Sequence, residues 1–373
     1  MTFSVSSTEL LKKLQLAGGA IGTNVVMPIL EDYHFTLEGN TLIIKASDLE
    51  TTIITQLEVN GNENGQIAVP AKILSETLKS LPQQPITFRS DIDNFGIEIT
   101  SSTGKYKMAG EDASDFPKTP ESDEVDEIKI PAKAIINGIG KTLFATSNDE
   151  LRPAMSGVLF QIDFDKIVMV ATDAHKLVKY TYNDIKSEIV TQFIVPKKVL
   201  SQLKGSLSNS SDLKISFNKS NAFFVNDDVQ MICRLIDSRY PDYNAVIPVE
   251  NPNRMSVNRA DLHSSLKRIA FYANQTTNQV TFTISDGSLT INAQDKDFSN
   301  EATEQLTCVY EGEPIQISFN AKFLAEMLSV LTVEEITLEM STPNRAGILK
   351  PGESDENEEI LMLVMPVMLS VGA

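Results

Sequence analysis

The sequence predicts an α+β protein that is built from three similar domains. The chain repeats its own pattern three times, and each repeat combines two helical stretches with several short strand-like runs. With 373 residues, of which 42% are hydrophobic, the chain is long enough for two or three separate cores. No run of 18 apolar residues occurs, so we expect no membrane-spanning segment.

The repeat is clearest in the segments VPAKILSETLKSL, VPKKVLSQLKGSL and FNAKFLAEMLSVL. Three lysines take equivalent positions in them, at offsets of 126 and 124 residues: Lys72, Lys198 and Lys322. An aspartate that follows a strand-like run recurs at offsets of 125 and 122 residues: Asp48, Asp173 and Asp295. These recurrences predict three domains of about 124 residues each.

The predicted domain boundaries lie in polar stretches between the repeats. ESDEVDE (residues 121–127) and VENPNR (residues 249–254) carry turn-forming and charged residues. We therefore predict domains at residues 1–125, 126–250 and 251–373.

Helices and strands are expected at corresponding places in each repeat. Apolar residues at helical spacing predict six helices, at residues 8–16, 70–81, 131–144, 196–207, 259–272 and 320–331. Alternating or continuous apolar runs predict strands, among them residues 41–46, 85–90, 167–172, 213–218, 288–293 and 335–340. Two helices and many short strands per repeat give the α+β class.

Charge is distributed unevenly between the helices and the rest of the chain. The chain carries a net charge of −18, which by itself argues against nucleic-acid binding. The six helical windows, however, hold 13 Lys and Arg against 4 Asp and Glu. Ordinary solvation of amphipathic helices explains such a pattern in any one helix. Its recurrence predicts that the helices line a surface that faces a polyanion and meets phosphates without reading sequence.

The stretch VATDAHKLVKY (residues 170–180) places Asp, His and Lys between apolar runs, as a catalytic centre would. One hypothesis is therefore an enzyme in which Asp173 and His175 act as acid and base. Against it, Asp48 and Asp295 repeat the aspartate but His175 has no counterpart. A repeated aspartate after a strand indicates turn capping.

Other chemistries lack sequence support. The three histidines form no HExxH motif, and no GxxxxGK[ST], GxGxxG or GxSxG motif occurs, so we expect no catalytic residue, metal or cofactor. The only cysteines, Cys233 and Cys308, show no CxxC spacing, which fits a reducing compartment. The first residues do not form a secretory signal. We therefore expect a cytoplasmic protein.

The whole chain resembles the bacterial DNA sliding clamp, the beta subunit of DNA polymerase III. The stretches that carry the resemblance are VATDAHKLVKY, RLIDSRYPDYNAVIP, VMPVML, MPIL and DASDFP. The resemblance implies the DNA clamp fold, in which each domain packs two helices on antiparallel sheets, and a ring-forming head-to-tail homodimer. It implies a non-catalytic processivity factor that encircles double-stranded DNA without sequence specificity. The polymerase, the clamp loader and repair proteins would bind it through short linear peptides.

Three groups of site residues follow from the resemblance. The peptide-binding pocket would use Met155, Thr172, Ala174, His175, Lys176, Leu177, Pro241, Val246, Asn320, Phe323, Leu363, Met365 and Pro366, with Pro343 and Arg345 at variable positions. The DNA-facing residues would be Lys12, Lys13, Lys72, Lys133, Lys141, Arg152, Lys197, Lys198, Lys204, Lys267, Arg268 and Lys322. The dimer interface would use Lys105, Tyr106, Lys107 and Met108 against Phe271, Tyr272, Glu301 and Glu304.

Two pocket positions depart from the family pattern. Ala174 stands where glycine is common, and Lys176 where arginine is common. A lysine lacks the planar fork of donors that arginine offers, so peptide preference is expected to differ. Besides the clamp and the enzyme, a repeat-built interaction scaffold that binds no DNA is a third hypothesis.

Overall fold

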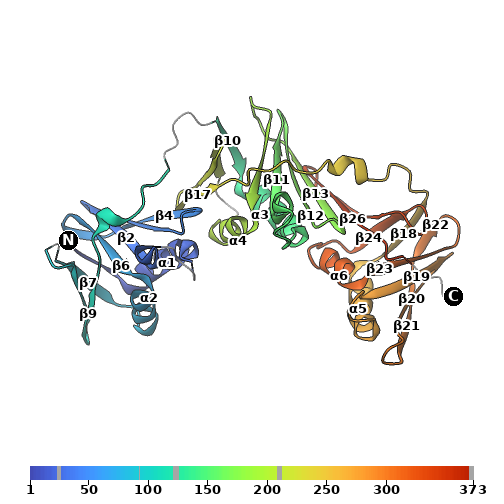
Figure 1. Cartoon of the computed structure of the whole chain (residues 1–373), viewed down its shortest axis with the longest axis horizontal. Coiled ribbons are helices and arrows are strands. Elements are labelled where there is room, and N and C mark those ends of the chain that lie inside the picture. Colours follow the sequence, from blue (N-terminus) through green and yellow to red (C-terminus); the bar gives the residue numbers. More distant parts are fainter. Residues whose placement is uncertain (23–26, 92, 121–125, 208–211, 369–373) are drawn as a thin grey trace. The chain divides into compact units, whose positions relative to one another are not determined.

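The computed structural model describes residues 1–22, 27–91, 93–120, 126–207 and 212–368. Its contacts group into two compact units, which we describe separately (Figure 1). Unit 1 comprises Met1–Lys133 and Lys198–Leu235, and unit 2 comprises Ala134–Lys197 and Ile236–Ala373. Within the described ranges, no helix has the length and apolar character needed to cross a membrane.

Unit 1 contains two antiparallel sheets. The first has the strand order β5 (Asn60–Glu63), β1 (Thr2–Ser6), β7 (Pro85–Ser90), β8 (Gly96–Thr100) and β9 (Lys105–Ala109). The second has the order β10 (Asp126–Pro131), β15 (Asp212–Phe217), β16 (Asn221–Val225), β17 (Val229–Arg234), β4 (Thr51–Glu58), β3 (Thr41–Ser47), β2 (Asp32–Glu38) and β6 (Gly65–Pro70).

Unit 2 also contains two antiparallel sheets. The larger has the order β14 (Thr191–Pro196), β11 (Gly157–Ile162), β12 (Lys166–Thr172), β13 (Lys176–Asn183), β26 (Glu358–Val364), β25 (Gly347–Pro351), β24 (Glu335–Met340), β18 (Asn253–Asn258) and β22 (Val309–Glu311). The smaller has the order β21 (Asn300–Thr307), β20 (Ser288–Asp295), β19 (Gln279–Ser285) and β23 (Ile315–Asn320).

All six predicted helices are present. They are α1 (Ser7–Ala17), α2 (Ala71–Ser80), α3 (Ala132–Thr142), α4 (Lys197–Ser206), α5 (Arg259–Ile269) and α6 (Ala321–Ser329). Each buries an apolar stripe at helical spacing, as α1 does with Leu10, Leu14 and Ala17. In Figure 1, α1 lies beside α2 within unit 1, and α5 lies beside α6 within unit 2.

The same sequence of elements occurs three times along the chain, which confirms the predicted α+β fold of three similar domains. A strand runs directly into a helix twice per repeat, as in β6–α2, β14–α4 and β23–α6. The lysines of the repeated segment all occupy the second position of these helices.

Each repeat also contains a hairpin with an aspartate at its turn. The Oδ1 atoms accept backbone hydrogen bonds from Thr51 (2.7 Å, to Asp48), Lys176 (2.9 Å, to Asp173) and Asp297 (3.0 Å, to Asp295). The predicted turn-capping role of this aspartate is therefore confirmed in all three copies.

Candidate functional site

The turn between β12 and β13 is closed by two side chains. The Thr172 Oγ1 donates to the Lys176 carbonyl (2.7 Å) and accepts from the Ala174 amide (3.1 Å). The Asp173 Oδ1 accepts from the amides of His175 and Lys176, both at 2.9 Å. These bonds hold Ala174 at φ 76°, in the left-handed region that favours glycine.

An apolar cluster lies directly behind this turn. Leu177 pairs with Thr172 on one side and with Leu363 on the other, and Leu363 pairs in turn with Ile348. The buried members of the cluster are Ala154, Leu159, Val168, Val170, Leu177, Ile194, Tyr240, Tyr243, Ala346, Ile348 and Leu363. Two residues predicted for the peptide-binding pocket, Leu177 and Leu363, are thus brought together.

Exposed apolar side chains stand at the edge of this cluster. Val246 is 54% exposed and closes the short 3-10 helix η6 (Tyr243–Val246), whose first residue belongs to the cluster. Met365 is 40% exposed, and its amide donates to the His175 carbonyl (2.8 Å). Pro241 is also exposed, whereas Met155 and Pro366 are half-buried. Such groups can receive apolar anchors of a peptide.

Helix α6 contributes two more of the predicted residues. The Phe323 ring stacks on the His175 ring at a centroid distance of 6.2 Å. The Asn320 side chain caps the helix: its Oδ1 accepts from the amides of Lys322 (3.0 Å) and Phe323 (3.3 Å). Its Nδ2 donates to the Thr277 carbonyl (3.0 Å), so the Asn320 amide is already used within the fold.

Lys176, which the resemblance assigns to the peptide-binding pocket, is buried. Its side chain is 7% exposed, and its ammonium contacts carboxylates of Asp173 and Glu326. Pro343 and Arg345, in the loop between β24 and β25, are exposed.

Sequence reasoning missed part of the cluster. Tyr240 donates its hydroxyl to the Val170 carbonyl (3.2 Å), and Tyr243 donates to Gln161 Oε1 (2.6 Å). Both tyrosines are buried. The signal was present in RYPDYNAV, where two aromatic residues flank an exposed Pro-Asp pair.

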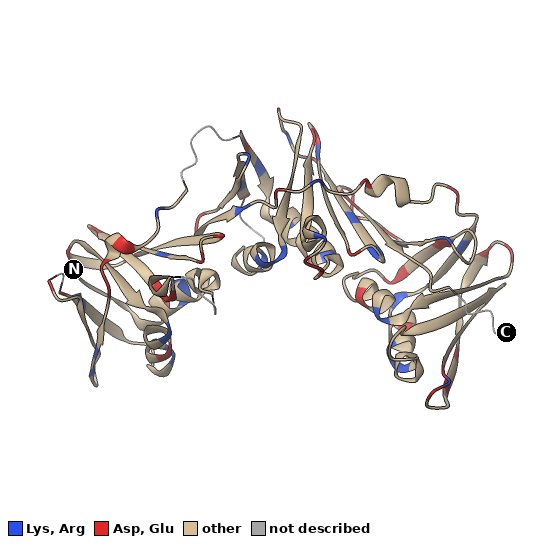
Figure 2. Cartoon of the chain, viewed as in Figure 1, with Lys and Arg blue, Asp and Glu red and all other residues tan. Residues whose placement is uncertain are grey.

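The predicted DNA-facing residues fall into two classes. The first class is exposed and forms no ion pair with a described residue: Lys12, Lys72, Lys133, Lys204, Lys267 and Lys322. The half-buried Lys197 also forms no such ion pair, and its ammonium donates to the Asn148 amide oxygen (3.3 Å). The others form ion pairs within their own unit: Lys13–Asp228 (2.8 Å), Lys141–Glu358 (2.6 Å), Arg152–Asp149 (3.4 Å), Lys198–Asp48 (2.5 Å) and Arg268–Glu304 (2.5 Å). Figure 2 shows Lys and Arg on the helices and many acidic residues at hairpin turns.

Lys141 differs from the other cations because its partner is buried. Glu358 is 7% exposed and also accepts a hydrogen bond from Asn137 (2.7 Å). Burial alone would raise the pKa of Glu358, but the hydrogen bonds from Lys141 and Asn137 hold it below the ordinary 4.5. The Lys141 ammonium also lies 5.3 Å from the Tyr180 ring centroid. These contacts give Lys141 an internal structural role.

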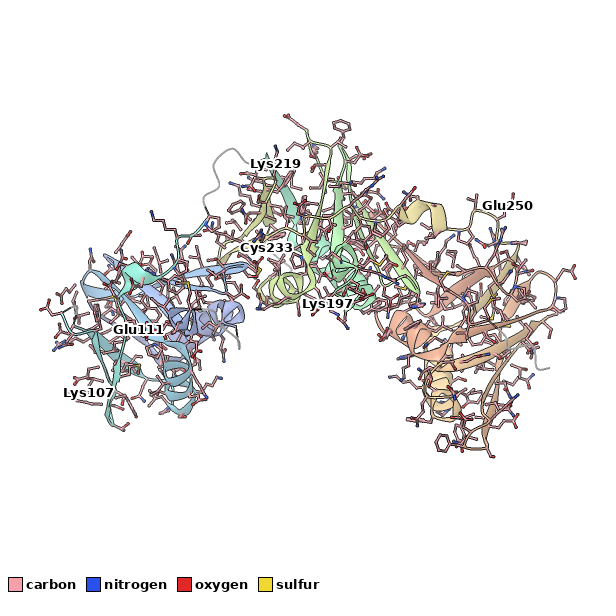
Figure 3. All side chains as sticks on the ribbon, viewed as in Figure 1. Lys107, Glu111, Lys197, Lys219, Cys233 and Glu250 are labelled. Atoms are coloured by element: carbon pink, nitrogen blue, oxygen red, sulfur yellow. The ribbon has the colours of Figure 1, made fainter. Side chains whose placement is uncertain are left out.

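Two edge strands and a short 3-10 helix carry the residues predicted for the dimer interface. β9 is the outer strand of its sheet, where the ammonium groups of Lys105 and Lys107 lie 3.3 and 3.5 Å from carboxylate oxygens of Glu98. Tyr106 and Met108 alternate with these lysines and are half-buried. Figure 3 labels Lys107 on this strand.

The other edge strand, β21, contacts the 3-10 helix η7 (Ala270–Tyr272). On η7, Phe271 is 84% exposed and Tyr272 is 45% exposed. On β21, Glu301 is exposed and Glu304 is half-buried in its pair with Arg268.

The proposed acid–base pair does not have a catalytic arrangement. The Asp173 carboxylate is occupied by turn amides and Lys176, while the His175 ring stacks on Phe323. Among the described residues, no group of three His, Cys, Asp or Glu side chains could hold a metal ion. Cys233 and Cys308 are free and buried, and burial raises the pKa of the Cys233 thiol to about 12.

Comparison with known proteins gives consistent matches along the whole chain. Models of the DNA polymerase III beta subunit match in order: the N-terminal domain at residues 1–120, the central domain at 129–242 and the C-terminal domain at 244–367. The beta sliding clamp of Vibrio cholerae is 28% identical and covers 99% of this chain and 100% of its own length. That of Synechococcus elongatus is 29% identical, with 97% of each chain covered.

Solved structures are similar over the same length. A sliding clamp from Pseudomonas aeruginosa, solved with griselimycin bound, superposes with a TM-score of 0.94 at 25% identity and covers 99% of this chain and 100% of its own. The DNA polymerase sliding clamp from Bacillus subtilis gives a TM-score of 0.93 at 24% identity, with 99% of each chain covered.

Proposed function

Because the chain belongs to the family of DNA polymerase III beta subunits, the sliding clamps that confer processivity on the polymerase, we propose that it forms a closed head-to-tail homodimer around double-stranded DNA. In this role it tethers the polymerase, the clamp loader and repair proteins through short linear peptides. The three family models support three domains, with a first change between residues 120 and 129, near the expected residue 125, and a second between residues 242 and 244, slightly before the expected residue 250.

The observation that carries this proposal is the set of exposed helix lysines that have no carboxylate partner among the described residues. These lysines recur on all three repeats, while the chain as a whole carries −18. Lysines meet phosphates as point charges and read no bases, so contact with DNA is sequence-independent and weakens with salt. The acidic residues in the rest of the chain limit the affinity for DNA, and a weak affinity suits a ring that must slide along the duplex.

The ring would close through the two edge strands. Unpaired backbone groups on β9 of one protomer can meet those on β21 of its partner. Lys105 and Lys107 would then approach Glu301 of the partner subunit. Phe271 and Tyr272, which are exposed in the single chain, would bury their rings against Tyr106 and Met108.

The peptide would bind over the apolar cluster of unit 2. Leu177 and Leu363 form the floor, while Val246, Met365 and Pro241 offer exposed apolar surface. The half-buried methionine Met155 can repack around different anchors. His175 and Phe323 would line the neighbouring part of the surface, with Thr172, Ala174 and Pro366 completing it.

We further propose that the protein acts in the cytoplasm and has no active site of its own. The buried free thiols support a reducing compartment. The contacts of Asp173 and His175 support a structural rather than an acid–base role. A scaffold that binds no DNA remains the competing function, which the following test separates from the clamp.

The test loads the full chain, with its own clamp loader, onto nicked circular DNA and measures retention by gel filtration. A clamp stays on the circle at moderate salt and is released when the DNA is cut to a linear form. If the protein is not retained on the circular DNA, the clamp function is refuted. If it is retained equally on linear DNA, it binds DNA without encircling it, which also contradicts the clamp.

The dimer is tested separately by sedimentation. Phe271→Ala combined with Tyr272→Ala should convert the dimer to monomers, because the interface loses two large apolar anchors. Phe164→Ala is the matched control, since Phe164 is 62% exposed on the hairpin between β11 and β12. An unchanged dimer in the double variant contradicts the interface assignment.

A further inference from the structure

We propose that Lys176 is a positioning residue: it holds the residues of the peptide-binding surface in place from inside the fold and does not touch the peptide. This inference rests on the proposed peptide-binding function. It assigns to Lys176 the task of tying the β12–β13 turn to helix α6, and so of fixing the ring of Phe323.

The ammonium of Lys176 has no access to a bound peptide, because its own unit surrounds it. Its Nζ lies 2.8 Å from Glu326 Oε2 and 3.3 Å from Asp173 Oδ2. Of the three side chains, only that of Glu326 reaches well into solvent, at 48% exposed. Two carboxylates therefore satisfy a charge that would be costly to bury alone.

Two aromatic rings complete the surroundings of the ammonium. Its Nζ lies 4.4 Å from the Phe323 ring centroid and 5.8 Å from that of Phe144, which belongs to the 3-10 helix η4 (Leu143–Ala145). Both distances allow a cation–π attraction. Phe323 is thus in contact with the Lys176 ammonium and also stacks on His175, so its orientation depends on two residues of the turn.

Asp173 connects this arrangement to the shape of the turn. One carboxylate oxygen caps the amides of His175 and Lys176, and the other faces the Lys176 ammonium. Ala174 occupies a left-handed conformation that disfavours residues with a Cβ. The turn therefore depends on Asp173, and the position of Asp173 depends on Lys176.

A consequence for recognition follows from the charge balance. The Lys176 charge is matched by the two carboxylates of Asp173 and Glu326, so this turn offers no unpaired lysine to an acidic peptide side chain. The peptide is therefore selected by apolar anchors and backbone contacts at this point. Loss of Lys176 should weaken acidic and neutral peptides equally.

The experiment measures fluorescence anisotropy with two labelled peptides. Both contain a glutamine and two leucines, and they differ only in an aspartate or an alanine between the leucines. For the full-length chain, Lys176→Met should weaken both peptides about tenfold, since the β12–β13 turn and the Phe323 ring lose the ammonium that ties them together. Lys176→Arg, which keeps the charge and the cation–π contact, should stay within about threefold of the unchanged chain.

Two further measurements separate positioning from contact and from misfolding. In the free protein, Lys176→Met should speed hydrogen exchange of the amides of residues 174–176, which a residue that acts only by touching the peptide would not do. Glu326→Gln is a milder variant that removes one carboxylate and should weaken both peptides less. Lys350→Met is the matched control, because it removes another lysine–glutamate pair of unit 2, the one with Glu339 at 2.9 Å.

The outcomes are distinct. A loss confined to the aspartate peptide, with unchanged exchange, overturns the inference in favour of direct contact. Equal affinity of Lys176→Met and the unchanged chain overturns it as well. If the unchanged chain binds neither peptide, the proposed peptide-binding function itself fails.

Discussion

Replacing Asp32 by asparagine should stabilise unit 1 at pH 8 and give little or no stabilisation at pH 5. Asp32 begins β2 and is 6% exposed, and its Oδ2 has no hydrogen-bond partner within the described residues. Burial, with the nearby charges of Glu111 and Glu31, raises the pKa of Asp32 from 3.8 to about 7. The folded chain therefore resists the ionisation that the unfolded chain undergoes freely.

The size of the effect follows from that difference in pKa. A pKa raised in the folded state gives stability that is complete below pH 3.8 and is lost as the pH rises through about 7. At 1.36 kcal/mol for each pKa unit, the full loss is at most about 4 kcal/mol. Part of it, about 1.5 kcal/mol, is already lost at pH 5, so about 3 kcal/mol should separate the two pH values. The buried side-chain amide of the new asparagine lacks a hydrogen-bond partner, which lowers the stability by about 1–3 kcal/mol at every pH.

Urea denaturation followed by circular dichroism measures this at pH 5, 6, 7 and 8. Hydrogen exchange of peptides from β2 assigns the transition to unit 1. Asp115→Asn is the control, because Asp115 is an exposed aspartate of the same unit. If the stability difference between Asp32→Asn and the unchanged chain is the same at pH 5 and pH 8, the carboxyl is not protonated in the fold and the reasoning is wrong.

Two further predictions follow from the ion pairs. Asp228→Asn frees Lys13 to meet a phosphate, so the slope of log affinity against log salt should steepen by about one in DNA-binding titrations; Glu127→Gln, which frees a lysine on a strand, should leave the slope unchanged. Glu358→Gln removes the charged partner of the half-buried Lys141 and should lower the stability of unit 2 by about 1.5–3 kcal/mol at pH 7 in denaturation curves. Because the pKa of Glu358 lies below 4.5 in the fold, its contribution is lost as the pH falls below that value, and an equal loss at pH 3 would contradict it.

The elements that sequence reasoning predicted well are those with a local cause. Helices α1 to α6 follow from apolar residues three and four positions apart, which needs no knowledge of distant contacts. The helix predicted over residues 259–272 ends earlier, at Ile269, and continues as the 3-10 helix η7. The capping role of Asp173 follows from its repetition at Asp48 and Asp295.

The roles that were not foreseen depend on partners far away in the sequence. Lys176 and Lys141 were assigned to binding surfaces, but each has a carboxylate partner far along the chain: Glu326 lies 150 residues after Lys176, which also contacts the nearby Asp173, and Glu358 lies 217 residues after Lys141. No local pattern reveals such a pair. The helix cap formed by Asn320 could have been predicted from the sequence, because an asparagine directly before a helical run is a common signal for a helix start.

The pairing of β13 with β26 bears on the order in which the protein acquires its binding surface. These strands lie side by side in the larger sheet of unit 2, yet Lys176 and its partner Val364 are separated by most of the second half of the chain. Contacts between such distant segments form late, because the intervening loop must first be closed. During synthesis, the edge of β13 that pairs with β26 has no partner strand until β26 emerges from the ribosome. If the proposed peptide-binding function holds, a growing chain therefore cannot bind such peptides before its third repeat has been made.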